Sequence, residues 1–187
     1  MKICTATLAS ISPYSQSRAH EAAKLDRETS DAYEQRTWRE KAHFDKAGQV
    51  YIPPMAFKMS LDKAAQMLGL QIPGKGKSTY TKYFLSGVLV LEPLMLGIKK
   101  DDLPFDRIHA NADGVRGSGK RVWRIFPRID QWEGDVDFHV LANEITKDVF
   151  EIALRQSGQF VGIGRFRPEK GGFYGRFEVK SVKWTEM

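Results

Sequence analysis

Positive side chains, aromatic rings and glycines are concentrated in one stretch, residues 161–179 of a chain of 187 residues. Five glycines stand there, and glycine lets a backbone adopt positive φ and approach a ligand closely. Arginine pairs with phosphate through two hydrogen bonds, exposed backbone amides bind anions, and aromatic rings stack on unpaired bases. The stretch predicts a nucleic-acid contact, with a basic surface hairpin as the alternative. The residues expected to bind are Arg165, Phe166, Arg167, Lys170, Phe173, Tyr174 and Arg176.

Positive charge also gathers in two other segments. Residues 71–82 hold three lysines and no acid, and residues 116–128 hold five basic residues and no acid. Together with the net charge of +6, these segments favour a polyanionic partner held in a groove. The binding residues predicted from them are Lys75, Lys77, Arg121, Trp123 and Arg124.

Two motifs that would indicate other chemistry do not fit. The run Gly74-Lys-Gly-Lys-Ser-Thr lacks the glycine that a nucleotide-triphosphatase loop needs five residues before Gly76, where Gln71 stands, so ATP binding is rejected. The aspartates around His109, in residues 99–119, follow no metal-ligand spacing and are typical of turns. We therefore expect no cofactor and no metal site.

Only His20, His43, His109 and His139 could serve as histidine acid or base, and no two of them have a telling spacing. No catalytic residue is predicted, and RNA cleavage remains a less favoured alternative.

Length and composition predict a single domain over residues 1–187. The one cysteine, Cys4, excludes an intramolecular disulfide and favours a reducing cytoplasm, that of a bacterial host cell. The chain shows neither a signal-like nor a membrane-spanning apolar run, so we expect no membrane partner.

The N-terminal half predicts strands that alternate with charged or helical segments. A strand is expected over residues 2–11, and a charged segment over residues 14–47 predicts either a helical or a mobile insertion, anchored by Trp38 and Phe44 where it docks. A short strand ends at Pro53 and a helix begins near Pro54, with apolar residues at helical spacing that predict a core-facing side. These are Met55, Met59, Leu61, Ala64, Ala65 and Leu68.

The C-terminal half begins with a buried strand over residues 87–91 and an irregular connection over residues 99–119. Residues 121–129 and 135–142 predict a hairpin that turns at residues 130–134, with its arginines either paired with aspartates or left on an open face, according to register. A helix capped by Thr146 runs to about Gln159, and the last strand, residues 175–184, carries a bulge.

The order strand, strand, helix, glycine-rich loop, strand is typical of a ferredoxin-like half. The run Gly162-Ile-Gly-Arg, closed by Gly171-Gly-Phe-Tyr-Gly-Arg-Phe, resembles the C-terminal glycine-rich loop of the RAMP superfamily, the RNA-recognition-motif-like proteins of CRISPR systems. Val50-Tyr-Ile-Pro-Pro-Met-Ala-Phe-Lys is similar to the strand-to-helix element of that family. The C-terminal third also resembles small proteins of bacteriophages and prophages.

The resemblance implies an α+β, modified ferredoxin-like (RRM-like) antiparallel sheet with helices on one face, to which the charged insertion is added. It also implies contact with single-stranded RNA or DNA through Lys58 and the glycine-rich loop, with CRISPR effector subunits as partners and self-association as a further expectation. The sequence therefore predicts a non-catalytic, single-stranded nucleic-acid-binding protein. The alternatives are an anti-CRISPR-type phage inhibitor that mimics or binds a backbone subunit, and an endoribonuclease.

Overall fold

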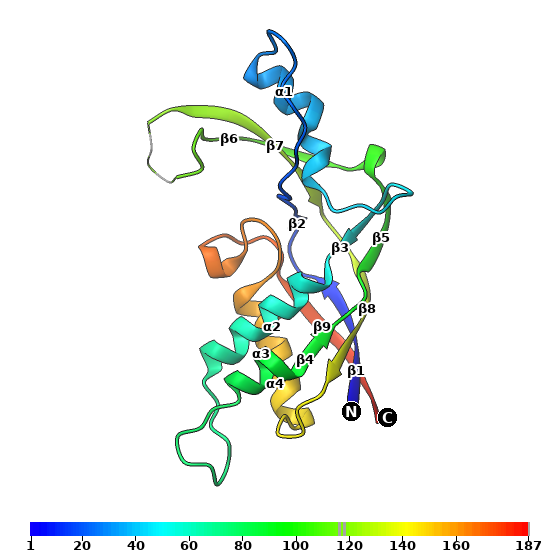
Figure 1. Ribbon diagram of the computed structural model, residues 1–187, viewed down its shortest axis with the longest axis vertical. Coiled ribbons are helices and arrows are strands. Elements are labelled where there is room, and N and C mark those ends of the chain that lie inside the picture. The colour runs from blue at the N-terminus through cyan, green and yellow to red at the C-terminus, as the bar shows by residue number, and fades with distance from the viewer. Residues whose placement is uncertain (116, 118, 187) are drawn as a thin grey trace.

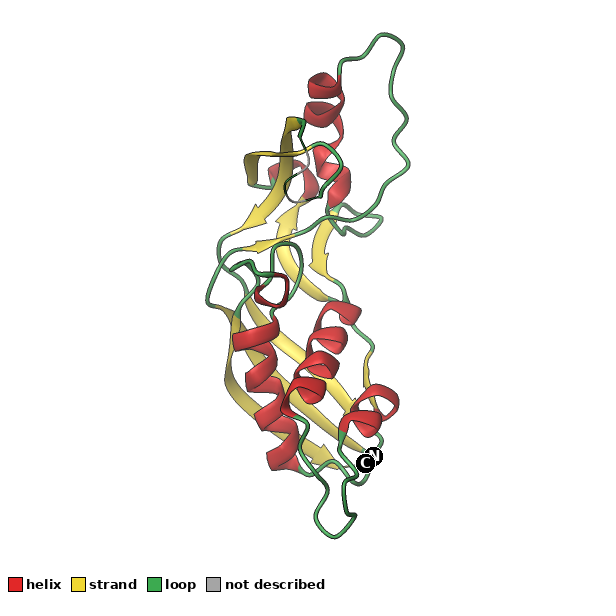
Figure 2. Cartoon of the chain, turned by 90° about the vertical axis from the view of Figure 1, so that its left-hand side faces the viewer, coloured by secondary structure: helices red, strands yellow, loops and turns green. Residues whose placement is uncertain are grey.

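The computed structural model describes residues 1–115, 117 and 119–186. They form an elongated molecule in which a larger and a smaller lobe follow one another along the long axis (Figure 1). The two termini lie side by side at the far end of the larger lobe (Figures 1 and 2). Within the described residues, no helix is long and apolar enough to cross a membrane.

The larger lobe is a four-stranded antiparallel sheet covered by helices on one face (Figure 2). The strand order is β4 (Val88–Val90), β8 (Glu133–Val140), β1 (Lys2–Ser10), β9 (Phe177–Glu186). The covering helices are α2 (Pro54–Leu68), α3 (Thr81–Gly87) and α4 (Lys147–Gln156). Each outer strand is reached through a helix, β4 after α2 and β9 after α4, which is the ferredoxin-like topology. The predicted α+β fold is confirmed.

Local sequence explains these elements. Cys4, Ala6 and Leu8 in β1 are buried while Thr5 and Thr7 between them are partly exposed, the period of two that a half-covered sheet requires. Helix α2 begins with Pro54 and ends at Gly69, which has a φ of 54°. Thr146 caps α4 by accepting a hydrogen bond from the Val149 amide, as expected. The core between sheet and helices includes Leu8, Phe57, Leu61, Phe84, Phe138, Phe150 and Phe177.

The smaller lobe holds a three-stranded sheet of β2 (Tyr14–Ser15), β7 (Arg121–Ile129) and β6 (Phe105–Asn111). The segment 14–47 supplies α1 (Ser30–Thr37) and the 3-10 helix η1 (Trp38–Lys41), which lie beside β7. Trp38 is buried with its ring 5.2 Å from that of Phe105, so it anchors the insertion as predicted. Between the lobes, β3 (Gln49–Ile52) pairs with β5 (Leu94–Lys99), which leads into η2 (Lys100–Asp102).

The predicted hairpin at residues 130–134 is wrong. Strand β7 pairs with β6 and β2, whereas β8 pairs with β1 and β4, so the chain passes from one sheet into the other (Figure 1). The side chain of Trp132 is buried, and a Cβ on Gly134 would lie 2.4 Å from Leu94 Cδ1. Gly134 therefore makes room for packing rather than for a turn. The hairpin of this region is β6–β7: β6 lies inside the segment 99–119 expected to be irregular, and β7 is the strand expected over residues 121–129.

The helices differ from the sequence-based expectation in the exposure of two methionines and in the presence of α3. Met55 and Met59 are more than half exposed on α2, although Leu61, Ala64 and Ala65 are buried as predicted. The stretch before β4 forms α3, which the sequence did not indicate. After Gln156 the chain makes one π-helical turn, η3 (Ser157–Val161), and the bulge in β9 lies between the pairs Leu8↔Val179 and Thr7↔Ser181. The bulge is confirmed.

Candidate nucleic-acid interface

The glycine-rich loop, residues 162–176, is closed by its own backbone. The Ile163 amide donates to the Gly175 carbonyl over 3.0 Å, and the Tyr174 amide donates to the Phe166 carbonyl over 3.0 Å. A Cβ on Gly175 would lie 1.8 Å from the Ile163 carbonyl oxygen, and one on Gly172 would lie 1.9 Å from that of Phe166. These glycines permit close approach of the protein to itself, which corrects the expectation that they serve approach of a ligand.

The loop is fixed to the smaller lobe through the strand β2. The Arg165 amide donates to the Ser15 carbonyl over 2.8 Å, and the Gly175 amide donates to the Pro13 carbonyl over 2.7 Å. Phe166 has a φ of 57°, a left-handed conformation that is costly for an aromatic residue and is held by the bonds around it. The loop therefore presents its side chains from a rigid frame.

Arg165 is the cation that this frame positions. Its guanidinium carbon lies 4.0 Å from the centroid of the Phe126 ring, and its Nε donates to Ser15 Oγ over 3.1 Å. Burial lowers its pKa, an effect that Tyr174 and Asp106 oppose. No carboxylate of the described residues forms an ion pair with it. Its terminal nitrogens are thus donors that an anion could use.

A second cation contacts the same ring. Lys41 Nζ lies 4.3 Å from the Phe126 centroid and forms an ion pair with Glu34, whose other oxygen is 3.3 Å from Arg124. Burial lowers the pKa of Lys41, and the Glu34 carboxylate opposes that shift. Three cations therefore surround this part of β7, and Glu34 is the carboxylate that pairs with two of them.

Aromatic rings continue the surface beyond Arg165. Phe166, Phe173 and Tyr174 form a cluster with ring centroids 4.8–5.7 Å apart. Tyr174 is buried, and its hydroxyl donates to Asp106 Oδ2 over 3.0 Å, which ties the loop to β6. Phe166 is 42% exposed and Phe173 53% exposed, so their rings are the ones open to a base.

The opposite face of the β6–β7 hairpin carries another basic and aromatic group. Trp123 is 47% exposed, with the His109 ring 5.0 Å from its ring and the Arg107 guanidinium 4.7 Å from its centroid. Arg121 donates to the His109 carbonyl over 2.6 Å. Alternation along β7 thus separates Trp123 and Arg121 from Arg124. Sequence reasoning missed Arg107, although the alternation in residues 105–111 could have revealed a strand.

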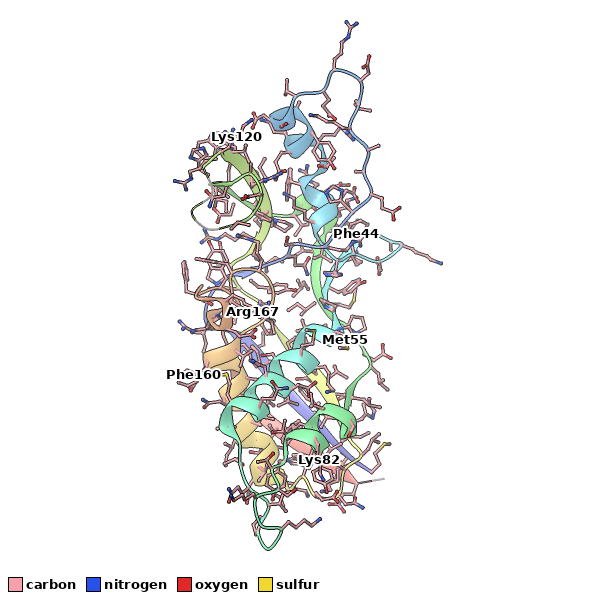
Figure 3. All side chains as sticks on the ribbon, turned by 60° about the vertical axis from the view of Figure 1, so that its left-hand side comes forward. Phe44, Met55, Lys82, Lys120, Phe160 and Arg167 are labelled. Carbon is pink, nitrogen blue, oxygen red and sulfur yellow. The ribbon has the colours of Figure 1, made fainter. Side chains whose placement is uncertain are left out.

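Several predicted binding residues lie elsewhere. Lys58 is buried, and its ammonium contacts Asp62 and the carbonyls of Phe84 and Leu85, which places it in the protein interior. Lys75 and Lys77 stand in the loop before α3, at the end of the larger lobe. In Figure 3 this end is marked by Lys82, with Arg167 midway and Lys120 near the other end. The three basic segments therefore do not converge in one groove.

Three cations of the glycine-rich loop have partners within the loop or beside it. Arg167 Nε donates to Glu169 over 2.9 Å, Lys170 lies 3.6 Å from the same carboxylate, and Arg176 donates to the Gln159 carbonyl over 3.1 Å. Arg165 is the loop cation that remains without such a carboxylate or carbonyl acceptor among the described residues.

The sheet face that the helices leave open carries a row of carboxylates on β8, beside Lys180 and Lys183 of β9. Thr5 donates to Asp137 and Thr7 to Asp135, each over 2.6 Å, and both aspartates are exposed. The expectation that these aspartates face the arginines of β7, in one register or the other, is therefore wrong, because β8 pairs with β1. A row of carboxylates repels phosphate, so the loop and the hairpin are the more favourable side for a polyanion.

Comparison with known proteins identifies the fold. Sequence searches found no matching family model and no matching curated protein. A chain in the cryo-EM structure of the type III-B Cmr-beta bound to cognate target RNA is similar over 99% of this chain and 61% of that chain, with a TM-score of 0.55 and 15% identity. The two chains share a fold. Cmr6 from Pyrococcus furiosus also matches, over 95% and 97% of the two chains, with a TM-score of 0.44 and 13% identity.

The likeness confirms the expected fold. The sequence identity of 15% is too low to assign roles to residues of this chain from residues of the Cmr-beta chain. The chain spans about three fifths of the length of the Cmr-beta chain, 61%, so the activity and partners of that longer protein remain separate questions.

Proposed function

We propose that this protein binds single-stranded nucleic acid and prefers RNA to DNA. The phosphates of the strand are held at Arg165. The observation that carries the proposal is a half-buried guanidinium, stacked on Phe126, for which the described residues offer no carboxylate partner. Lys41 and Arg124 add positive potential beside it, although both contact Glu34. A phosphate there would meet donors that need no rearrangement.

The preference for a single strand rests on the exposed rings. Phe166 and Phe173 offer stacking platforms, and bases in a duplex are already stacked on one another. The preference for RNA is supported by the fold likeness to a chain whose complex was solved with cognate target RNA.

We further propose that the protein acts with a CRISPR effector complex, a role supported by the RAMP-like fold. The alternative is a phage inhibitor that mimics or binds a backbone subunit. Such an inhibitor would associate with the complex without binding RNA itself. Retrieval of effector subunits with a tagged protein supports the association, and their absence from a host that expresses the complex contradicts it.

We propose that binding occurs without cleavage. The four histidines lie on different elements: His20 beside Tyr33, His43 beside Tyr51, His109 beside Trp123, and His139 in β8. Labelled RNA incubated with the protein, with and without Mg²⁺ or Mn²⁺, should remain intact. Cleavage products would make the protein an endoribonuclease.

The test of binding is fluorescence anisotropy of labelled single-stranded RNA, single-stranded DNA and duplex DNA over a salt series. We expect salt-dependent binding that prefers single strands. Arg165→Gln should weaken binding to all sequences and reduce the slope of log K against log salt by about 0.7, the contribution of one phosphate on a single strand. Arg27→Gln is the matched control, because Arg27 is 94% exposed on the distant insertion. An unchanged slope in Arg165→Gln would refute the assignment.

A further inference from the structure

A cleft of about 400 Å³ lies between helix α2 and the glycine-rich loop. Loop residues Gly164 and Arg167 line it, whereas Arg165, between them in sequence, turns away to contact Phe126. The loop therefore separates the cleft from the proposed phosphate contact. Ligand pockets in proteins begin at about 300 Å³, so the volume is sufficient for a small planar group.

One side of the cleft is lined by exposed apolar side chains that do not pack in the core. Met59 of α2 is 59% exposed and Leu85 is 48% exposed, and both line the cleft. Met55 and Met67 on the same helix are exposed to a similar degree, 56% and 54%, but do not line it. Methionine is a flexible, polarizable side chain that adapts to an aromatic ring.

The polar groups around the cleft suit the edge of a base and its phosphate. Lys63 supplies positive charge, Arg167 and Lys170 are paired with Glu169, which also lines the cleft, and Gln66 can both donate and accept. Asp62 also lines the cleft. One of its oxygens accepts from Lys58, and its Oδ1 has no hydrogen-bond donor within the described residues. A base with an exocyclic amino group would supply a donor of that kind.

We infer that this cleft receives one unstacked, amino-bearing nucleobase of a strand bound at Arg165. The inference rests on the proposed function and adds a base-binding site to it. A strand that crosses the loop leaves a phosphate on the Arg165 side and turns one base into the cleft. There the base packs on Met59 and faces Gln66 and Asp62, while the cations of the rim lie near its phosphate.

The test compares two fluorescent 12-mers of equal charge, oligoadenylate RNA and a strand of stable abasic spacers. Met59→Ala should weaken binding of oligoadenylate about five- to tenfold, within the range for loss of one base contact, and leave the abasic strand unchanged. The matched control Met67→Ala should change neither strand. Both side chains are exposed, so both variants should fold, which thermal melting checks.

The outcomes separate the two proposals. If the wild-type protein binds both strands and the two methionine variants behave alike, the base site is refuted while phosphate binding stands. An equal loss on both strands in Met59→Ala also refutes the base site. If neither strand binds at low salt, the proposed function fails, and the base site fails with it.

Discussion

The buried carboxylate of Glu34 holds helix α1 against the free edge of β7, and its removal should destabilise the protein strongly. Glu34 is 2% exposed, and it accepts hydrogen bonds from the Ile125 amide over 2.6 Å and from Lys41. Lys41 in turn donates to the Ile125 carbonyl over 2.7 Å. Two side chains thus take the place of a neighbouring strand at this edge.

Glu34→Ala would leave the Lys41 ammonium, on a side chain 11% exposed, without its carboxylate, and the Ile125 amide without an acceptor. Removal of one partner from a buried ion pair costs about 3–5 kcal/mol, a large part of the about 5–15 kcal/mol that stabilises a typical domain. The control is Glu133→Ala, whose pair with Lys180 is about half exposed at both side chains. That pair should contribute at most about 1 kcal/mol.

Urea unfolding followed by circular dichroism measures both variants, and pH gives a second signature. Burial raises the pKa of Glu34, but hydrogen bonds from Lys41 and the Ile125 amide outweigh burial and lower the pKa below its usual 4.5. A depressed folded pKa stabilises the protein above the unfolded pKa, and this contribution is lost as pH falls through the folded value. The difference between wild type and Glu34→Ala should therefore shrink below about pH 4.5. A loss under about 1 kcal/mol, or a difference that is constant down to about pH 3, would refute the reasoning.

Three further predictions concern the loop and the core. Tyr174→Phe removes the hydroxyl that donates to Asp106 and should cost about 1–3 kcal/mol in urea unfolding, since a part-buried hydrogen bond to a carboxylate is lost; an unchanged midpoint would contradict the tie between loop and β6. Gly175→Ala should prevent native folding or lower Tm by many degrees, because its Cβ would lie 1.8 Å from a backbone carbonyl oxygen. Gly171→Ala, with a φ of 76° but no atom within 4 Å, should cost only about 1–2 kcal/mol, and equal losses would overturn the packing argument. Burial raises the pKa of the Cys4 thiol to about 12, so a thiol reagent at pH 8 should label it only in urea; rapid labelling of the native protein would disagree.

Local patterns in the sequence predicted the elements whose signals are local. The Thr146 cap, the helix start at Pro54 and the alternation of Trp123 and Arg124 all depend on neighbours within a few residues, and the structure has each of them. The glycine-rich loop was also placed correctly between a helix and the last strand.

Long-range pairing was not predictable from the same patterns. A buried tryptophan beside Gly134 looks like a turn in sequence, because nothing local shows that Leu94 fills the space left by the missing Cβ. The site has the same limitation. Arg165 and Phe126 are 39 residues apart, and their contact depends on how β2 joins the loop to β7. Charge density alone could not tell Arg165 from Arg167, which Glu169 neutralises.

Strand β7 of the smaller lobe leads directly into strand β8 of the larger lobe, and this continuity affects how the molecule would respond to force. Strands β7 and β8 follow each other along the long axis, and the Trp132 carbonyl between them accepts from the Ser10 amide over 2.9 Å, at the end of the central strand β1. A pull on the tip of the β6–β7 hairpin would load the middle of the ferredoxin-like sheet directly, through covalent bonds. The hairpin is therefore an extension of the sheet, and tension applied to it reaches β8 along the backbone.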